Sequence, residues 1–284
     1  MSQRHTRFRE VATYSRSHFQ PYISDRRCFS PAQFRGTNMS TLSVVFAVCI
    51  VVFQTKALKL PDYITPCSRK DPHLNECALK HGREAIPRVI KGDPKYGIPV
   101  LDPMYIPEVS IQESGIKITG REIVIEGARN AILEDFRVDF DKLIVSIQFM
   151  APQLDFRGKY ELSGKLVSLP IVGKGDYNAT LGNLTAKYTT QCNLTKQGDG
   201  RTYLSPQDYD LEFDPKTASM YFGNLFNGNK LLGDAMNSFI AENWRLVLDQ
   251  IGKPAYRALG MIVHQILVQV AHKVPYDELF SDTD

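Results

Sequence analysis

The C-terminal part of the sequence carries a long apolar stripe with the period of an α-helix. Between residues 228 and 273, apolar side chains recur at steps of three and four residues, interrupted at Gly252 and Pro254. The stripe consists of Leu232, Met236, Phe239, Ile240, Trp244, Val247, Leu248, Ile251, Leu259, Ile262, Val263, Ile266, Leu267 and Val270. We predict one kinked helix of about 45 residues, which at about 1.5 Å per residue extends over roughly 60 Å. A helix of that length requires an elongated molecule.

The preceding part, from Val109 to about Phe222, alternates between apolar and polar residues with a period of two. The clearest run, 154–166, predicts a strand of about 13 residues, longer than the usual five or six. The apolar members of the clearest runs are Leu154, Phe156, Tyr160, Leu162 and Leu166; Ile132, Phe136, Val138 and Phe140; Leu143, Val145, Ile147 and Phe149; and Tyr209, Leu211 and Phe213. One-sided alternation predicts an antiparallel sheet with one solvated face. Around Gly182 the apolar residues change face, as a β-bulge would cause.

A long apolar helix and a one-sided sheet can bury each other's apolar faces. We therefore predict an elongated α+β fold, in which the sheet curls around the C-terminal helix and leaves an internal apolar tunnel for a hydrophobic ligand. The candidate ligand-binding residues are Phe136, Val138, Phe149, Phe156, Tyr160, Tyr188, Phe222, Phe239 and Trp244. Tyr160 and Tyr188 offer hydroxyls for a polar end of the ligand. The alternative for each of these residues is that it fills the core.

Residues 1–57 differ in composition from the rest of the chain, with eight of its 34 basic residues and two of its 31 acidic ones. Residues 42–53 form an uncharged stretch of twelve residues. This is shorter than the about 20 residues that a bilayer span needs. The small residues Thr55 and Ala57 follow, a pattern typical of a secretory signal peptide. We predict a signal peptide at 39–57 and a single secreted domain at 58–284.

Residues 1–38 precede this segment, whereas a signal peptide normally begins a chain. Our interpretation is that synthesis starts at Met39 and that 1–38 are an upstream extension. A signal anchor with a basic tail and a mitochondrial presequence are the alternatives, and the apolar stretch argues against the presequence. Without residues 1–57 the formal net charge changes from +3 to −3. The basic excess therefore gives no reason to expect a nucleic-acid partner.

Two of the cysteines, Cys67 and Cys77, bracket the start of a predicted helix at 72–91, which Pro87 kinks or ends. They form either a disulfide or part of a metal site. Because no CxxC motif or histidine cluster accompanies them, we predict a disulfide and no metal. In the chain-entropy model such a short loop contributes about 3 kcal/mol.

The remaining cysteine of the predicted domain, Cys192, has three possible roles: a buried thiol, an intermolecular disulfide or a nucleophile. It shares an apolar strand face with Leu184, Ala186, Tyr188 and Leu194, which favours the buried thiol.

Three N-x-[ST] sequons occur close together, at Asn178, Asn183 and Asn193. Downstream of a signal-like segment they indicate passage through a secretory pathway. Asn183 and Asn193 lie on the polar side of the alternation, so we expect glycans to project from the solvated face of the sheet.

Signals for catalysis are weak. The sequence contains no GxSxG, HExxH or P-loop motif, and its six histidines are scattered. His264 lies one residue from the helix stripe, which favours a packing role. Gly173–Asp176 contains a lone G-x-G with no predicted helix after it, so we predict a turn at the end of a strand.

Short motifs follow one another along the chain in a characteristic order. They are Leu60–Cys67 with Cys77, Gly97–Pro103, Leu169–Asp176, Leu225–Asn229, Asn243–Arg245 and Val274–Phe280. In this order they resemble the insect takeout and juvenile-hormone-binding-protein family, across nearly all of residues 60–284. The resemblance implies a secreted carrier whose long helix is wrapped by a strongly curved antiparallel sheet around a lipophilic tunnel. It also implies that Cys67–Cys77 is the family's N-terminal disulfide.

The chain departs from the family pattern in two places. Hormone-binding members carry a second disulfide, for which Cys192 has no visible partner. This places the chain nearer the takeout branch and leaves juvenile hormone open as the ligand. The extension 1–38 is not a family feature.

We therefore predict a secreted, non-enzymatic carrier of a juvenile-hormone-like terpenoid, a fatty acid or another long lipophile. It would need no cofactor and would not insert stably into a membrane. The alternatives are a ligand-dependent extracellular signalling module that docks on a receptor, and a hormone esterase. An esterase requires a nucleophile and base pair that the sequence does not reveal.

Overall fold

The computed structural model describes residues 57–113 and 115–281, which belong to one compact unit, Ala57–Asp284. The predicted extension 1–38 and all of the predicted signal peptide except Ala57 lie outside the described residues. In the described part of the chain, no helix combines the length and apolar character that crossing a bilayer requires.

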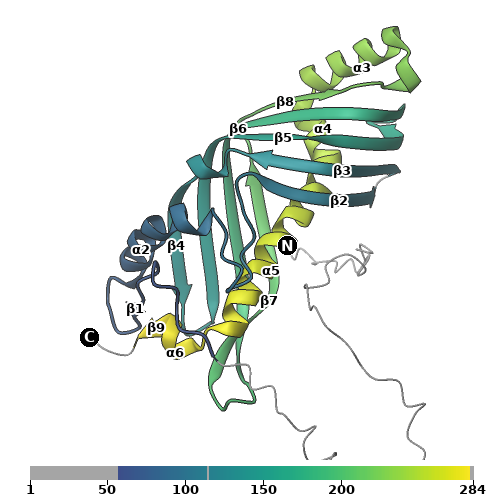
Figure 1. Cartoon of the computed structure of the whole chain (residues 1–284). Coiled ribbons are helices and arrows are strands. Elements are labelled where there is room, and N and C mark those ends of the chain that lie inside the picture. The colour runs from purple at the N-terminus through teal and green to yellow at the C-terminus, as the bar shows by residue number, and fades with distance from the viewer. Residues whose placement is uncertain (1–56, 114, 282–284) are drawn as a thin grey trace, which may run out of the picture. The chain divides into compact units, whose positions relative to one another are not determined.

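Seven antiparallel strands form one curved sheet in the described residues (Figure 1). They are β2 (Met104–Glu113), β3 (Ile116–Glu126), β4 (Ile132–Asp139), β5 (Ile144–Leu166), β6 (Leu169–Lys196), β7 (Thr202–Asp214) and β8 (Thr217–Phe222). The strand order is β2-β3-β5-β6-β7, with β4 paired to β5 and β8 paired to β6. The sheet stays open, because its order begins at β2 and ends at β7. The predicted antiparallel sheet is confirmed.

Strands β5 and β6 are the centre of the sheet and have 23 and 28 residues. They pair in a single register from Ile144 with Gln191 to Leu166 with Leu169. The inward-facing residues change side where Pro152 and Asn183 lie opposite each other, and Asn183 has a φ of 48°. The predicted change of face near Gly182 is confirmed, but the β-bulge expected to cause it is not found between β5 and β6, whose register is the same on both sides. The predicted strand 154–166 is too short, because β5 continues through this point.

The change of face divides the sheet into two halves with different neighbours. In the β3/β8 half, residues 155–164 of β5 pair with β3, and residues 177–182 of β6 pair with β8. In the β4/β7 half, residues 144–150 of β5 pair with β4, and residues 185–196 of β6 pair with β7. Two strands thus run through both halves, while the flanking strands differ.

The segment Gly173–Asp176, predicted as a turn, lies inside β6, and that prediction is wrong. A Cβ atom at Gly173 would lie 2.5 Å from the Tyr160 hydroxyl oxygen. A Cβ atom at Gly175 would lie 2.6 Å from the carbonyl oxygen of Gly223. Both glycines are therefore required by close contacts across a strand and not by a reversal of the chain.

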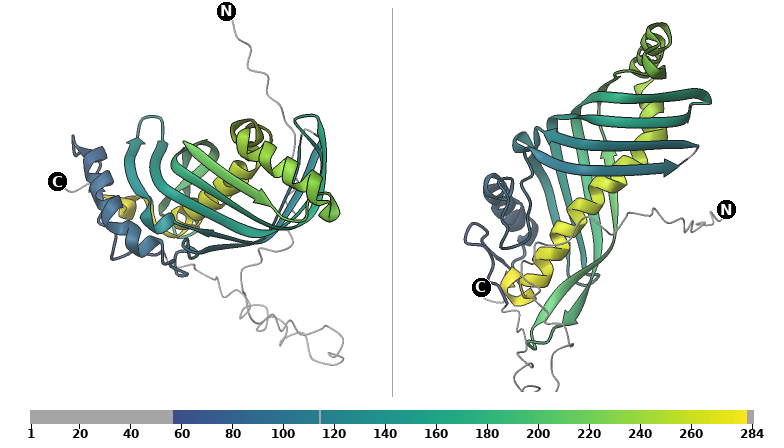
Figure 2. Two further views of the ribbon diagram at one scale, coloured as in Figure 1. Left: turned by 90° about the horizontal axis from the view of Figure 1, so that it is seen from above. Right: turned by 45° about the vertical axis from the view of Figure 1, so that its right-hand side comes forward.

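The C-terminal helical region lies along the concave face of the sheet (Figure 2). It comprises α3 (Lys230–Glu242), α4 (Trp244–Val247), a π-helical turn (Leu248–Gly252) and α5 (Lys253–Lys273). The wrapping of the sheet around a helix is thereby confirmed, and the predicted kink at Gly252 and Pro254 coincides with the end of the π-helical turn.

The prediction of a single helix is wrong in its first third, because α3 ends at Glu242 and Asn243 is its C-cap. The backbone of Asn243 has a φ of −115°, outside the helical region. Its backbone N–H and its side-chain amide both donate to the carbonyl oxygen of Phe239, at 2.9 Å each. The side-chain amide is therefore a second donor to this carbonyl oxygen, beside the backbone bond of the last helical turn.

The N-terminal part of the unit is joined to its C-terminal part (Figure 1). Strand β1 (Cys67–Ser68) pairs in parallel with β9 (Phe280–Ser281), which follows the short helix α6 (Tyr276–Leu279). The predicted helix 72–91 is α2 (Leu74–Val89), which continues past Pro87.

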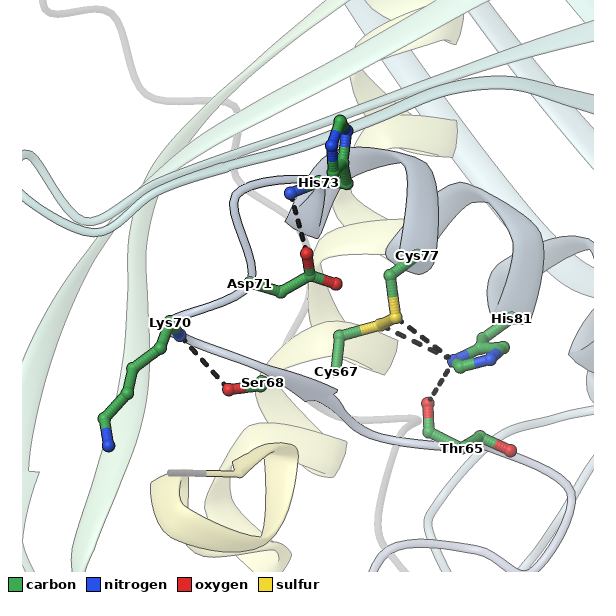
Figure 3. The surroundings of a disulfide bond; sticks show 8 residues. All are labelled: Thr65, Cys67, Ser68, Lys70, Asp71, His73, Cys77 and His81. Carbon is green, nitrogen blue, oxygen red and sulfur yellow. Dashed lines mark hydrogen bonds between the residues drawn. A yellow bond between two sulfur atoms is a disulfide. The ribbon is translucent and has the colours of Figure 1, made fainter. Parts of the chain in front are cut away.

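The predicted disulfide between Cys67 and Cys77 is present (Figure 3). Nδ1 of His81 lies 3.5 Å from each of the two sulfur atoms and 3.0 Å from the carbonyl oxygen of Thr65. The disulfide takes up both thiolates that a metal site at this histidine would need.

Candidate ligand-binding site

A cavity of about 180 Å³ lies between the β3/β8 half of the sheet and the π-helical turn with the start of α5. Its walls are Ile106, Val109, Ile111, Ile118, Gly120, Ile123, Ile125, Phe156, Tyr160, Tyr177, Ala179, Leu181, Met220, Phe222, Leu248, Gly252, Tyr256 and Leu259. Apart from three tyrosines and two glycines, every lining residue is apolar, and none is charged. The volume slightly exceeds that of a cavity of about 150 Å³ known to hold benzene.

The aliphatic wall comes from β2 and β3, whose isoleucines point inward at alternate positions. The register of β3 against β5 shifts between Arg121 and Val124, and Glu122 has a φ of 53°. This bulge re-aims the strand, so that Ile118 on one side of it and Ile123 on the other both reach the cavity.

The aromatic wall comes from β5, β6 and β8. Tyr160 meets Phe222 edge to face, with ring centroids 5.1 Å apart, and Tyr177 stacks on Phe222 at 6.0 Å. The Tyr160 hydroxyl donates to the carbonyl oxygen of Gly223 at 2.7 Å. Burial raises the pKa of Tyr160 to about 12. These contacts fix the rings and leave their apolar surfaces facing the cavity.

A third tyrosine of the wall, Tyr256, comes from α5. Its ring stacks on Phe213 of β7 at 4.2 Å. Its hydroxyl oxygen is buried and has no hydrogen-bond partner within the described residues. A Cβ atom at Gly252 would lie 2.7 Å from this oxygen, so the absence of a side chain there makes room for the hydroxyl.

In the β4/β7 half of the sheet, aromatic rings bridge the space between the strands and α5. Tyr209 stacks on His264 of α5 at 4.9 Å and on Tyr188 at 5.9 Å. The Tyr188 hydroxyl is hydrogen-bonded to His264 Nδ1 at 2.6 Å, and the Tyr209 hydroxyl donates to the carbonyl oxygen of Arg257. Burial lowers the pKa of His264, which Asp208 opposes in part. His264 therefore has the packing role predicted for it.

The structure brings three of the nine predicted ligand-binding residues into the cavity wall: Phe156, Tyr160 and Phe222. Phe239 and Trp244 pack against the hydrophobic cluster that includes Tyr160 and Phe222, without being lining residues. Tyr188 is buried in the β4/β7 half. The three others, on β4 and the start of β5, also lie outside the lining: Phe136, Val138 and Phe149.

The hydroxyls predicted to orient a ligand, those of Tyr160 and Tyr188, are both hydrogen-bonded within the protein. The lining residues missing from the prediction are mainly the isoleucines of β2 and β3 and the residues of the π-helical turn and α5. Alternation at Ile116, Ile118, Ile123 and Ile125 was the available signal, but the bulge at Glu122 breaks it.

The free thiol of Cys192 is buried, next to Leu204 and Ala271. Burial raises the pKa of this thiol, so the unreactive protonated form is favoured. The prediction of an inward-facing buried thiol is confirmed.

The three sequon asparagines, Asn178, Asn183 and Asn193, are all exposed on β6. Exposure is what glycosylation requires, and the modification itself stays a prediction.

The fold and the cavity together define an α+β ligand-binding protein, in which an open antiparallel sheet covers a C-terminal helix. The chain belongs to the family described as haemolymph juvenile hormone binding protein, whose family model matches residues 44–281.

Two relatives and one solved structure are similar to this chain over most of its length. The circadian clock-controlled protein daywake of Drosophila melanogaster is 28% identical over 236 residues, which is 78% of this chain and 88% of that protein. The daywake of Drosophila yakuba is 25% identical over 228 residues, 76% of this chain and 88% of that protein. The crystal structure of Epiphyas postvittana Takeout 1 matches with a TM-score of 0.69 at 26% identity, covering 77% of this chain and all of Takeout 1. The resemblance to the takeout and juvenile-hormone-binding-protein family is confirmed.

Proposed function

We propose that the protein is a non-enzymatic extracellular carrier, which holds a hydrophobic small molecule in the cavity of the β3/β8 half. The observation that supports this best is the composition of the wall, which offers apolar surface and no charged side chain. A ligand gains about 25 cal/mol for each Å² of apolar surface that it buries, so burying about 300 Å² yields roughly 7 kcal/mol before the cost of association. Long lipophiles such as terpenoids or fatty-acid derivatives meet this condition.

The size of the cavity bears on how such a ligand fits. Its volume of about 180 Å³ is below the range of about 300–1,000 Å³ that is usual for drug-sized ligands. A long lipophile therefore requires that wall side chains move, or that part of the molecule stays outside. Met220 has an unbranched, flexible side chain and is the wall residue best able to give way.

A carrier function without catalysis is supported by the chemistry of the wall. None of the lining residues is Ser, Cys, His, Asp, Glu or Lys. Hydrolysis by a protein nucleophile requires such a group beside the bound ester. Cys192, the candidate nucleophile of the sequence, lies in a separate cluster and not in the wall.

An extracellular location is supported by the disulfide, the exposed sequons and the apolar segment at 42–53. The test is to express the full chain in insect cells and to recover it from the medium. N-terminal sequencing should begin near Leu58, and an endoglycosidase should reduce the mass. Retention of the protein in the cells with residues 39–57 still attached would contradict this part of the proposal.

The ligand-binding part is tested on the protein purified from the medium. Extraction with organic solvent followed by mass spectrometry should recover a stoichiometric lipophile. N-phenyl-1-naphthylamine, a fluorescent apolar probe, should bind the protein and be displaced by long-chain esters. Protein that yields no lipophile and binds no probe would overturn the carrier function. Hydrolysis of the ester by the pure protein would overturn the non-enzymatic part.

A further inference from the structure

The Tyr256 hydroxyl is an unpaired polar group in an otherwise apolar wall. Its oxygen is buried and finds no hydrogen-bond partner within the described residues. Burying a hydroxyl without a partner costs free energy, and such groups in native structures call for an explanation. The Tyr160 hydroxyl, in the same wall, donates to the carbonyl oxygen of Gly223. Of the three tyrosines in the wall, Tyr160 thus has a hydroxyl that is bonded within the protein, whereas Tyr256 has a buried hydroxyl without such a bond among the described residues.

The position of this hydroxyl is fixed from two sides. The ring of Tyr256 stacks on Phe213 with an interplanar angle of 28°. The hydroxyl lies over Gly252, one helical turn earlier, where any Cβ atom would come within 2.7 Å of it. Gly252 is also the last residue of the π-helical turn, a local irregularity that is frequent at functional sites. Because the oxygen itself is fully buried, a ligand oxygen reaches it only after a neighbouring side chain of the wall has moved.

We propose that the Tyr256 hydroxyl donates a hydrogen bond to an uncharged oxygen of the bound lipophile, such as the carbonyl of an ester or a ketone, and so orients it in the cavity. This inference rests on the proposed carrier function. Burial raises the pKa of Tyr256 to about 12, so the hydroxyl keeps its proton at neutral pH. A phenol that stays protonated acts as a donor to a carbonyl oxygen.

The wall has no charged side chain, and this favours one class of lipophile over the others. Because no lining residue is Lys, Arg or His, an ionised carboxylate placed against Tyr256 would be buried without a counter-charge. A neutral carbonyl suffers no such penalty, and a pure hydrocarbon leaves the hydroxyl unpaired. The preferred ligand class is therefore a neutral lipophile with an oxygen acceptor, ahead of a free fatty acid or an alkane.

The experiment compares three ligands of similar length on the secreted, purified protein at pH 8. Methyl dodecanoate, pentadecane and sodium dodecanoate each compete with N-phenyl-1-naphthylamine. In Tyr256→Phe, which keeps the ring, we expect affinity for methyl dodecanoate to fall about five- to tenfold, as for a lost hydrogen bond. Affinity for pentadecane should stay within about twofold, and dodecanoate should bind the wild type more weakly than the methyl ester does.

Two further variants separate orientation from packing. Gly252→Ala keeps the hydroxyl but displaces it, and should also weaken the ester relative to the alkane. Tyr160→Phe is the matched control, because its hydroxyl is bound to Gly223, and it should change ester and alkane binding alike. Thermal unfolding checks folding, and Tyr256→Phe should not lower the melting temperature, because it removes an unpaired group.

The outcomes distinguish the two proposals. If the wild type binds none of the three ligands and no probe, the carrier function fails and this inference falls with it. If the wild type binds but Tyr256→Phe affects ester and alkane equally, the carrier function stands and the role of the hydroxyl is overturned. A clear loss of thermal stability in Tyr256→Phe would also overturn it, since the hydroxyl would then have a partner within the protein.

Discussion

The two halves of the sheet share strands β5 and β6 and the helix α5, yet they differ: the β3/β8 half, here called the hollow half, contains the cavity, and in the β4/β7 half, here called the filled half, aromatic rings reach the helix. In the β4/β7 half, the rings of Tyr188 and Tyr209 reach His264 of the helix and close the gap. In the β3/β8 half, the wall facing the helix is largely aliphatic, and its small residues Gly120 and Ala179 leave space. The difference shows that side-chain length at a few facing positions, and not the backbone fold, decides where a cavity remains.

The largest effect should come from emptying the filled half. Tyr188→Ala removes a buried ring from the stack with Tyr209, and we expect the free energy of unfolding to fall by about 3–5 kcal/mol. Phe156→Ala, in the cavity wall, should cost less, because this ring already borders open space. Urea unfolding of both variants measures the two values. Equal losses would mean that the two halves are packed equally well.

Next in size is the disulfide, which lies beside the β1 and β9 pairing at the far end from the cavity. Replacing both Cys67 and Cys77 by Ser should lower the free energy of unfolding by about 3 kcal/mol. Binding of N-phenyl-1-naphthylamine by the folded double variant should be unchanged, because neither cysteine lines the cavity. Loss of probe binding in a variant that remains folded would show that the two ends are coupled.

Filling the hollow half should have a smaller effect on stability and a direct effect on binding. Ala179→Phe adds a ring to the cavity wall and should weaken probe binding at least tenfold, or about 1.4 kcal/mol. Ala241→Phe, at an exposed position of α3, is the control and should leave the affinity unchanged. Fluorescence titration measures both, and undiminished binding by Ala179→Phe would place the ligand elsewhere.

The smallest effect concerns pH and again separates the halves. The pKa of His264 is lowered from 6.5 in the folded state, so the unfolded state binds a proton more readily. Stability should therefore fall as the pH drops through about 6.5, with a slope below 1.4 kcal/mol per pH unit for this one group. His264→Gln should have a weaker dependence between pH 7.5 and 5.5 than the exposed control His73→Gln. Identical unfolding profiles would show that His264 does not contribute.

The sequence predicts the fold class well, because alternation and helical periodicity are strong over long runs. Phe156, Tyr160 and Phe222 were found this way, and all three line the cavity. The extent of β5 was not predictable from alternation alone. At Pro152 the inward side changes, so one strand of 23 residues resembles two shorter strands in the sequence.

Three features depend on contacts in the folded protein that the local sequence pattern does not predict. The break at Asn243 is a non-helical backbone conformation, accompanied by a side-chain hydrogen bond to Phe239, within an otherwise continuous apolar stripe. Gly173 is needed because Tyr160 passes close to it from the neighbouring strand. The availability of the Tyr256 hydroxyl depends on the absence of a partner, and this becomes evident only when every surrounding group has been placed.

The single register of β5 and β6 has a consequence for how the molecule melts. Because these strands are paired from Ile144 to Leu166 through both halves, neither half can lose its sheet without exposing the ladder of the other. The halves differ in packing but share one set of backbone hydrogen bonds. Calorimetry should therefore record one cooperative transition, whose van't Hoff and calorimetric enthalpies agree. A less well packed half can persist in such a protein because the other half supplies its stability.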